Sequence, residues 1–555
     1  MPVIEVNLED FNRLVGKELG IEYLEERLPM LGCGWEGRTE EGFEIEVFPN
    51  RPDMLSIEGL ARAFSSFIGL RTGLRTYEVR ESEYRVRVEE RVSSIRPYIV
   101  SAVVKGVSFS DDLIRSIIQM QEKLHITHCR KRRKASIGLH DLEPISFPLT
   151  YTSRPRDFRF IPLDERREMS LEEILRETEK GREYGWILEG KEEYPILMDS
   201  KGMVLSMPPI INSIHTRIDE ETRDVFIDVT GTDEKTIREV LNIIVTTFAE
   251  RGAEVYRMRN IYPDRVVETP NLEPWRMRLE PGYVNRLLGL SLSNREIVEY
   301  LERMGFSARE EGGVLEVWVP CYRTDIMHPM DLVEEVAIAY GYDRFEPEIP
   351  EISTIGEEDP LEVFSRRLRD FLVGYGLMET VTFILSNKEK LFHRMGLEEE
   401  PVAETANPKT EEYCVLRNWL IPSLMEVLQN NRHHPYPQNL YEVGDVILLD
   451  PREETGARTC RRLAIVLCHS KASFSEVKAM AESILRNLGV EDYTTEEGDH
   501  GSFIEGRCFV MRREGETLCF GGEIRPEVLE NWGLEMPVAA LEMDVDLLFK
   551  VVKVG

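Results

Sequence analysis

Apolar and polar residues follow two spacings along the chain, and each spacing predicts a type of element. The alternation in "FEIEVF", residues 43–48, predicts a strand, because successive side chains of a strand point to opposite faces. The turn "NRPD" at 50–53 is followed by apolar residues at helical spacing, which predict a helix over 56–68. A later helix, "EKTIREVLNIIVTTFAERG", is expected to end at Gly252. Further strands are expected in "YIVSAVVKGVSF", "MVLSMPPIINS" and "RDVFIDVTGTD".

The second half of the chain contains a Pro- and Glu-rich stretch that divides it. Before this stretch, "LSLSNREI" predicts a helix with Ser293 or Asn294 as N-cap, and "VLEVWVP" predicts a strand. The stretch itself, "PEIPEISTIGEEDP", is expected to be a linker. Beyond it, helices alternate with strands, which indicates an antiparallel sheet flanked by helices. We therefore expect an α+β multidomain protein with domains at 1–87, 88–266, 267–350 and 351–555.

Length and composition agree with several soluble domains. At roughly 150 residues per domain, 555 residues correspond to three or four domains. The chain is 42% hydrophobic, and no apolar run reaches the roughly 18 residues that span a membrane. The acidic start lacks the features of a signal peptide. The eight cysteines include no Cys-x-x-Cys pair, which argues against a disulfide framework or a thiolate zinc site. A cytoplasmic protein is expected.

The net charge of −32 restricts how the chain can meet nucleic acid. Most of its surface should repel RNA, so contact requires a local basic patch or a partner chain. One such patch is "RKRRK", which comprises Arg130, Lys131, Arg132, Arg133 and Lys134. A phosphate contact and an ordinary solvated loop are both compatible with this run.

A cluster of carboxylates stands at the start of the predicted helix in "TDIMHPMDLVEEVAIAYGYDRF". Pro329 suits the first turn of a helix, which places Asp331, Glu334 and Glu335 on one face. Acidic residues there complement the helix dipole, by about 0.3–1 kcal/mol each. Asp325, outside the helix, adds a charge that the dipole does not require. A Mg²⁺ ion would relieve the repulsion, and a solvated acidic helix start is the alternative interpretation.

Several motifs occur together in a fixed order along the chain. They are "PNRPDMLSIEGLAR", "SMPPIINS" with "FIDVTGTD", "RTDIMHPMDLVEEVAIAYGYDRF", and "LRNWLIPSLMEVLQNNR" with "LYEVGDV". Together they resemble the family of phenylalanyl-tRNA synthetase β subunits in its shorter archaeal/eukaryotic form. The resemblance extends over nearly the whole chain.

The resemblance implies a fold and a set of partners. The expected domains are an N-terminal α/β domain, a B3/B4 editing domain, a winged, DNA-binding-like B5 domain and a class II synthetase-like domain. The implied enzyme is an α2β2 heterotetramer that uses ATP and Mg²⁺ to attach phenylalanine to tRNA(Phe). By the same resemblance, a Mg²⁺ site shared with the α subunit is assigned to Asp325, Asp331, Glu334 and Glu335.

The C-terminal domain departs from an active class II synthetase. An active site of that class uses an Arg-x-Glu strand and a Gly-rich motif ending in Arg to hold ATP. Here "NLYEVGDV" contains Glu442 without an Arg two residues before it, and "VAALEMDVDLLF" has no such Gly-rich motif. Without these phosphate contacts, adenylate formation loses its main electrostatic stabilisation. We therefore expect a catalytically silent domain, with no catalytic residue for aminoacylation in this chain. No counterpart of the bacterial anticodon-binding module is found, so the sequence leaves open how the anticodon end is held, with the partner chain as one candidate.

The region that resembles the editing domain is expected to hydrolyse mischarged Tyr-tRNA(Phe). An apolar phenylalanine pocket rejects tyrosine by only about a hundredfold, so a second site is needed. No Ser/His/Asp or Cys/His arrangement is recognisable, so hydrolysis by an oriented water is expected. The candidate pocket residues are Leu205, Asn212, Ser213, Arg223 and Asp233, with His140 and His215 as weaker candidates. Several of them equally suit ordinary turns, caps or the core.

Two other functions compete with this interpretation. A non-catalytic acidic scaffold that stabilises a partner enzyme is the main alternative, and deacylation of Tyr-tRNA would discriminate it. A Mg²⁺-dependent phosphotransferase would need a phosphate-binding loop, and none is present in the sequence. The "HITH" run at 125–128 has metal-like spacing without a third ligand nearby, which favours a helix or surface feature.

Overall fold

The computed structural model describes residues 2–554. The chain forms two compact units that divide between Ile349 and Pro350. The division falls within residues 346–359, which contain no helix or strand, as predicted for the linker.

The N-terminal part of the first unit is a small antiparallel sheet, in the order β1-β3-β2, with three helices. The predicted helix after the "NRPD" turn is α3, and the Ser56 hydroxyl accepts a hydrogen bond from the Gly59 amide as its N-cap. Apolar spacing and a good cap together explain why the helix starts there. The elements are β1 (Val3–Asn7), α1 (Leu8–Val15), α2 (Ile21–Arg27), β2 (Cys33–Arg38), β3 (Gly42–Val47), η2 (Pro52–Met54) and α3 (Ile57–Phe67).

The middle part contains a five-stranded sheet, in the order β4-β15-β6-β14-β7, and a seven-stranded sheet, in the order β13-β12-β11-β8-β5-β16-β17. Their strands are β4 (Val79–Arg80), β5 (Arg85–Val88), β6 (Tyr98–Lys105), β7 (Ala135–Asp141), β8 (Leu149–Pro155), β11 (Glu193–Met198), β12 (Val204–Met207), β13 (Ile211–Asn212), β14 (Val225–Gly231), β15 (Glu254–Tyr256), β16 (Met258–Ile261) and β17 (Val266–Thr269). The remaining elements are α4 (Asp111–Ile126), β9 (Arg159–Phe160), β10 (Met169–Ser170), α5 (Leu171–Glu177), α6 (Glu179–Tyr184), η5 (Ile214–Thr216) and α7 (Glu234–Glu250).

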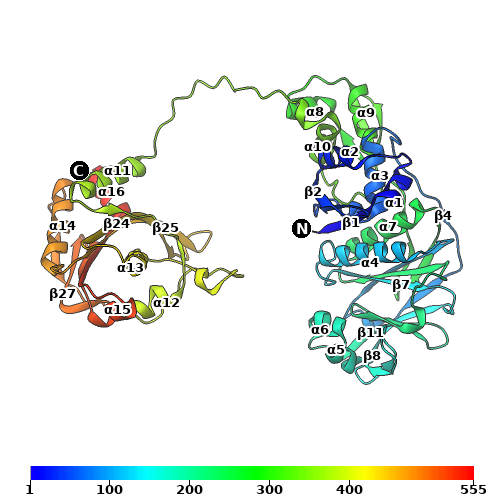
Figure 1. Ribbon diagram of the computed structural model, residues 1–555, viewed down its shortest axis with the longest axis horizontal. Helices are drawn as coiled ribbons and strands as arrows, with labels where there is room; N and C mark the ends of the chain where they lie inside the picture. Colours follow the sequence, from blue (N-terminus) through cyan, green and yellow to red (C-terminus); the bar gives the residue numbers. More distant parts are fainter. Residues whose placement is uncertain (1, 555) are drawn as a thin grey trace. The chain divides into compact units, whose positions relative to one another are not determined.

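Strand β14, which lies between β6 and β7, is buried on both faces. Val225, Ile227 and Val229 belong to the core that also contains apolar residues of α4 and α7. Phe226 belongs instead to a second core together with residues of the seven-stranded sheet. Helices α4 and α7 lie side by side over the five-stranded sheet (Figure 1). Burial on both faces explains why this stretch is almost continuously apolar and makes its one acidic residue, Asp228, conspicuous.

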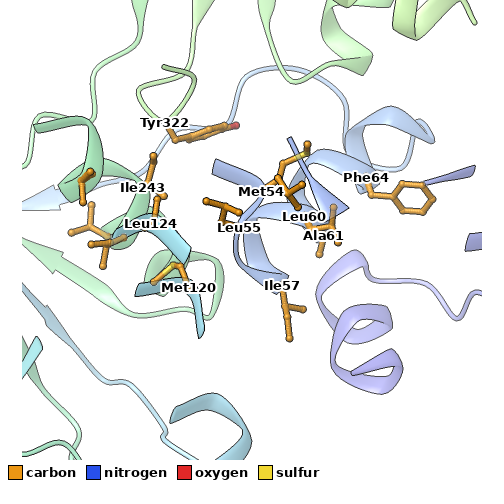
Figure 2. Close-up of a cluster of buried hydrophobic side chains, with 14 of the residues drawn as sticks. Met54, Leu55, Ile57, Leu60, Ala61, Phe64, Met120, Leu124, Ile243 and Tyr322 are labelled. Atoms are coloured by element: carbon orange, nitrogen blue, oxygen red, sulfur yellow. The ribbon is translucent and has the colours of Figure 1, made fainter. Parts of the chain in front are cut away.

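The core of the first unit is continuous between α3 and the middle part. Met54, Leu55 and Ile57 lie near Met120 and Leu124 of α4 (Figure 2). Because these residues are distant in sequence, the N-terminal part and the middle part share one apolar cluster.

The last part of the first unit has a three-stranded antiparallel sheet, in the order β18-β20-β19, and three helices. Ser293 is the N-cap of α9 and forms a capping box with Glu296. Helix α10 starts at Pro329, as the sequence predicts. The elements are β18 (Trp275–Leu279), α8 (Pro281–Leu288), α9 (Asn294–Arg303), β19 (Ser307–Glu311), β20 (Val314–Val319) and α10 (Pro329–Tyr340).

The second unit is built on a seven-stranded sheet in the order β21-β24-β25-β29-β28-β27-β26, antiparallel except for the β21–β24 pair. Alternate residues of β25 enter two different cores, Leu463 and Ile465 on one face and Ala464 and Val466 on the other. The strands are β21 (Met378–Glu379), β22 (Leu385–Ser386), β23 (Val415–Leu416), β24 (Gln438–Leu449), β25 (Ala457–Cys468), β26 (Thr494–Glu497), β27 (Phe503–Arg513), β28 (Glu516–Ile524) and β29 (Val538–Asp544). The helices are α11 (Pro360–Gly374), α12 (Lys388–Leu391), α13 (Ile421–Asn430), α14 (Phe474–Asn487), α15 (Pro526–Asn531) and α16 (Val545–Val554).

The predicted α+β multidomain fold with a C-terminal antiparallel sheet is confirmed. Over residues 2–554, no helix combines the length and the apolar character needed to cross a bilayer.

Candidate functional site

A cavity of about 290 Å³ lies in the middle part of the first unit. It is bordered by α4, by the start of β7, by α6 and by the loop between β12 and β13. Its lining residues are Ile118, Gln121, Glu122, Arg132, Ser136, Ile137, Gly138, Leu163, Asp164, Lys180, Ser206, Pro208, Pro209, Ile210, Ile211, Asn212 and Asp228. The lining combines apolar residues with polar and charged ones, and a concave site with convergent polar groups is typical of binding a small organic group.

Asp228 lines this cavity and is held in place from behind. Its Oδ1 lies 2.9 Å from Nε2 of His140, whose Nδ1 lies 2.8 Å from the Thr216 hydroxyl. A Cβ added to Gly138 would lie 2.2 Å from the same Asp228 oxygen. Glycine at 138 therefore leaves the space that the carboxylate occupies. The contact with His140 fixes Oδ1 of Asp228, and Oδ2 is left to hydrogen-bond with a group in the cavity.

Further polar groups face the same space. The Ser206 hydroxyl is buried and has no hydrogen-bond partner within residues 2–554. Since an unsatisfied buried polar group costs about 1–3 kcal/mol, it indicates a ligand or water at this point. Asn212 donates its amide to the Leu139 carbonyl at 3.2 Å. The Ser136 hydroxyl lies 3.0 Å from that of Thr230.

The opposite wall carries a group of charges. Arg132 donates to the Pro209 and Ile210 carbonyls at 3.2 and 2.9 Å, and to Glu122 at 2.9 Å. Partial burial acts to raise the pKa of Glu122, but hydrogen bonding with His125 and the charge of Arg132 outweigh it and lower that pKa to about 2. Glu122 is therefore ionised under all physiological conditions, and the wall keeps a fixed ion pair.

Two of the predicted site residues line the cavity, Asn212 from the editing set and Arg132 from the basic run. His140 lies behind Asp228 and does not line it. Of the others, Leu205 belongs to an apolar core, the Ser213 hydroxyl donates to the Ile161 carbonyl, and Arg223 donates to the Glu220 and Thr222 carbonyls. Asp233 is the N-cap of α7, and His215 is exposed. The roles predicted for these residues stay predictions, and the geometry does not bring them together at this cavity.

Sequence reasoning missed Asp228, Ser206, Ser136 and Gly138, which do line the cavity. One signal could have found Asp228. It is an acidic residue in the middle of the apolar run "VFIDV", and a buried carboxylate in such a run needs a special reason.

The basic run lies at the edge of this cavity. Arg132 turns inward, whereas Arg130, Lys131 and Arg133 are exposed. The Nζ of Lys134 lies 3.5 Å from Oδ2 of Asp233. Contact with nucleic acid stays a prediction for this run.

Most carboxylates at the acidic start of α10 are bound by other groups of this chain. Arg323 forms two-pronged ion pairs with Asp325, at 2.9 and 2.7 Å, and with Glu335, at 3.0 and 2.7 Å. Asp331 accepts hydrogen bonds from the Met327 and His328 amides, both at 2.7 Å. These contacts account for three of the predicted metal ligands without a cation.

Glu334 differs from these three because its carboxylate forms neither an ion pair nor a hydrogen bond with another described residue. Partial burial and the neighbouring charges of Glu335, Asp331 and Asp325 raise its pKa. Over residues 2–554, no three or more His, Cys, Asp or Glu side chains are grouped so that they could hold a metal ion. The four carboxylates therefore do not fit a Mg²⁺ ion within this chain alone, and the predicted site stays a prediction.

Two buried glutamates of the second unit are bound by other groups of the same unit. Glu442 is buried and pairs with Arg417 at 2.8 Å and with the Thr382 hydroxyl at 2.6 Å. Glu542 accepts hydrogen bonds from the Leu420 and Ile421 amides at the start of α13, at 2.8 and 3.2 Å. The Arg417 guanidinium is thus already bound by protein groups.

Comparison with family models covers most of the chain. Residues 108–255 match the B3/4 domain, residues 277–342 match the tRNA synthetase B5 domain, and residues 346–545 match the phenylalanyl tRNA synthetase beta chain CLM domain. The cavity residues thus lie in or next to the B3/4 match, and the acidic helix start lies in the B5 match.

Relatives match over their full length. The phenylalanine–tRNA ligase beta subunit of Pyrococcus abyssi is 43% identical over 556 residues, with 99% of this chain and 100% of that protein covered. The one from Archaeoglobus fulgidus is 42% identical over 552 residues, with 99% of each covered. A crystal structure of an N-terminal fragment of the phenylalanyl-tRNA synthetase beta subunit from Pyrococcus horikoshii aligns with a TM-score of 0.60 and 40% identity, covering 61% of this chain and 99% of that one. The chain belongs to the family of phenylalanine–tRNA ligase β subunits.

Proposed function

We propose that this chain is the β subunit of an ATP-dependent ligase that attaches phenylalanine to tRNA(Phe), and that its cavity hydrolyses mischarged Tyr-tRNA(Phe). The family relationship over 99% of the chain supports the ligase assignment. The observation that carries the hydrolytic role is the cavity of about 290 Å³, in which Asp228 and the unpartnered Ser206 hydroxyl face an apolar wall.

The chemistry of the cavity suits a tyrosyl group better than a phenylalanyl group. A site built to hydrogen-bond a substrate hydroxyl can reject the analogue without it by about 10⁴–10⁵, because its buried polar groups are then left unpaired. Asp228 and Ser206 are such groups, and Ile137, Pro209 and Ile211 supply apolar wall. The correctly charged Phe-tRNA would leave these polar groups without partners and would therefore be spared.

Hydrolysis by an oriented water fits the side chains better than a protein nucleophile. Both ring nitrogens of His140 already have partners, Asp228 and Thr216. Thr216 does not line the cavity, so this chain of contacts orients the carboxylate and activates no hydroxyl. The free oxygen of Asp228 can then accept a hydrogen bond from the tyrosyl phenol or from the attacking water.

The second unit is proposed to be catalytically silent and to support the synthetic site of the α subunit. Adenylate formation needs cationic side chains free to bind phosphates. Arg417 is instead paired with Glu442 and bonded to Thr382, and Glu542 occupies the start of α13. With these contacts the Arg417 guanidinium is not free to bind a nucleotide phosphate.

One surface of the second unit is suited to binding the α subunit. Residues 378–385 run from β21 to β22 and expose a row of apolar side chains, with Met378 at 68%, Val381 at 88% and Phe383 at 76% exposure. Large apolar groups gathered in one exposed segment are typical of an interface. A protein partner fits because the segment follows β21 on the outer edge of the sheet, next to β24.

The function is tested by phenylalanine-dependent ATP–pyrophosphate exchange. We expect no exchange by this chain alone and clear exchange when the α subunit is present. Phe383→Asp, which places a charge in the proposed interface, should weaken α–β association by at least tenfold, and exchange should fall with it. Association is measured by sedimentation, and Leu449→Asp is the matched control because Leu449 is exposed on a different strand, β24.

Three results would each contradict part of this assignment. Exchange by this chain alone would show that the second unit is an active synthetase. No exchange with the α subunit, together with no deacylation of Tyr-tRNA, would favour a non-catalytic scaffold. Normal assembly of Phe383→Asp would place the interface elsewhere.

A magnesium site shared with the α subunit is also part of the proposal, as is ATP as a substrate of the complex. Of the four predicted ligands, Glu334 is the one whose carboxylate has no ion pair or hydrogen bond with another described residue, and the neighbouring acids that raise its pKa favour a positive charge beside it. Asp325, Asp331 and Glu335 would complete the set only if their present contacts were exchanged. A cytoplasmic location is proposed on the same family relationship.

Calorimetric titration of the αβ complex with Mg²⁺ tests this site. We expect Glu334→Gln to weaken binding by about tenfold, because one anionic ligand is lost. Glu346→Gln, in the exposed linker, is the control and should bind as the parent does. If both variants bind Mg²⁺ with the same affinity, Glu334 is not a ligand of the site.

A further inference from the structure

The basic run beside the cavity contains a strained turn. Arg130, Lys131 and Arg132 are consecutive residues with φ values of 49°, 53° and 61°. The left-handed region costs a residue other than glycine roughly 1–2 kcal/mol, so three in a row are expensive. Such strain persists only where the surrounding structure over-determines the conformation.

Arg96 is the residue that holds this turn. It is buried at 1% exposure, and its guanidinium donates to the Arg132 carbonyl at 3.2 Å and to the Arg133 carbonyl at 3.4 Å. It also donates to the Thr230 carbonyl at 2.7 Å and to the Thr230 hydroxyl at 2.9 Å. Thr230 lies on β14 two residues after Asp228, so one side chain joins the turn to the strand that supports the cavity.

The cost of placing Arg96 there is high. Within residues 2–554 it has no carboxylate within ion-pair distance, and burial lowers its pKa to about 10. A buried charge without a counter-ion is normally selected against. A turn made only for structure could use glycine or asparagine and would need no such anchor.

The turn separates its cations into two groups. Arg132 points inward and bonds the Pro209 and Ile210 carbonyls of the cavity wall. Arg130, Lys131 and Arg133 point to solvent and form no ion pair with any described residue. In a chain with a net charge of −32, three unpaired neighbouring cations are unusual and are available to an anionic partner.

We propose that Arg96 is a positioning residue for hydrolysis of the mischarged tRNA, because it fixes the turn so that Arg130, Lys131 and Arg133 bind backbone phosphates of the tRNA whose esterified end enters the cavity. The proposal rests on the proposed function. The proposed site differs from a general basic patch. Hydrogen bonds of Arg96 and Arg132 hold the turn, and with it the three outward cations, in a fixed place beside the cavity wall. A phosphate held there is held at a fixed position relative to Asp228.

Steady-state deacylation of Tyr-tRNA by the α2β2 complex tests this proposal. For Arg96→Lys, which cannot donate to all four acceptors, we expect KM to rise about tenfold while kcat and the inhibition constant of free tyrosine change less than twofold. The slope of log Kd against log salt for tRNA should fall by about one to two, roughly one for each lost phosphate contact. Arg91→Lys, an exposed residue paired with Glu193 in the same part of the chain, is the control.

A second variant keeps the test decisive if Arg96→Lys does not fold. This is a triple variant that keeps Arg96 and removes the three outward charges, by Arg130→Gln, Lys131→Asn and Arg133→Gln. A rise in KM of at least tenfold and a salt slope lower by about two to three, for three lost phosphate contacts, are expected. An unchanged KM and salt slope in this variant would overturn the proposal, as would a folded Arg96→Lys protein that loses kcat and tyrosine inhibition together. Absence of deacylation by the parent complex would instead contradict the proposed function itself.

Discussion

Asp228→Ala should reduce deacylation of Tyr-tRNA by the α2β2 complex by about a hundredfold or more, and attachment of phenylalanine should stay within twofold of the parent. Removing a preorganised polar group of this kind typically costs about 10²–10³ in rate. Asp228 is positioned by His140 at 2.9 Å and faces the cavity, and no other carboxylate on its strand can replace it. Charging is spared because the synthetic site is proposed to lie in the α subunit. Deacylation of pre-formed Tyr-tRNA and charging are measured in parallel.

Asp233→Asn is the matched control for this prediction. The sequence singled out Asp233 as a pocket residue, but it caps α7 and does not line the cavity. Asparagine is also a good N-cap, so little stability should be lost. Deacylation should therefore be close to that of the parent. If Asp233→Asn loses activity and Asp228→Ala keeps it, the site lies at the start of α7 and the present assignment is wrong.

Glu542→Gln should remove a pH dependence of about 3 kcal/mol from the stability of the second unit. Complete burial raises the pKa of Glu542 from 4.5 to about 7, and a tenfold change in proton affinity corresponds to about 1.4 kcal/mol. The folded state therefore keeps a proton that the unfolded state releases between pH 4.5 and about 7. Stability from this residue is fully present below pH 4.5 and is lost as the pH rises to about 7. Glutamine has no proton to release and still accepts the two amide hydrogens of α13.

Hydrogen exchange of β25 and β29 amides in the full chain measures this effect, because a single unfolding transition is not expected for two units. The parent protein should lose protection between about pH 4.5 and pH 7 relative to Glu542→Gln, after correction for intrinsic exchange. Glu516→Gln, an exposed substitution at the start of β28, should follow the parent. A pH-independent difference between parent and Glu542→Gln would show that Glu542 does not titrate in this range.

Local features of the fold were predictable from the sequence. The helix after the "NRPD" turn, the Ser293 cap and the start of α10 at Pro329 all depend on residues within one or two turns of each other. The same holds for the linker, whose composition alone prevents a packed structure. The family could be recognised because its motifs are short stretches in a fixed order.

The candidate site was much less predictable. Asn212 and Arg132 were singled out and do line the cavity, whereas Asp228 and Ser206 were not. The acidic helix start shows the same limit, because spacing revealed the crowded carboxylates but could not reveal that Arg323 binds two of them. Spacing reports neighbours along one element only, and Arg323 stands outside the helix.

The sequence by itself determined the elements, the fold class and the family, because periodicity, caps and motif order are local properties of the chain. Only the tertiary structure decided which side chains share a site. Glu122 and Asp228 meet at one cavity because α4 packs on β7, which pairs with β14, although the two residues lie far apart in the sequence. Likewise Arg96 reaches a turn and a strand that no pattern connects to it. The physical reason is that hydrogen bonds and charges act over a few ångströms, whatever the separation along the chain.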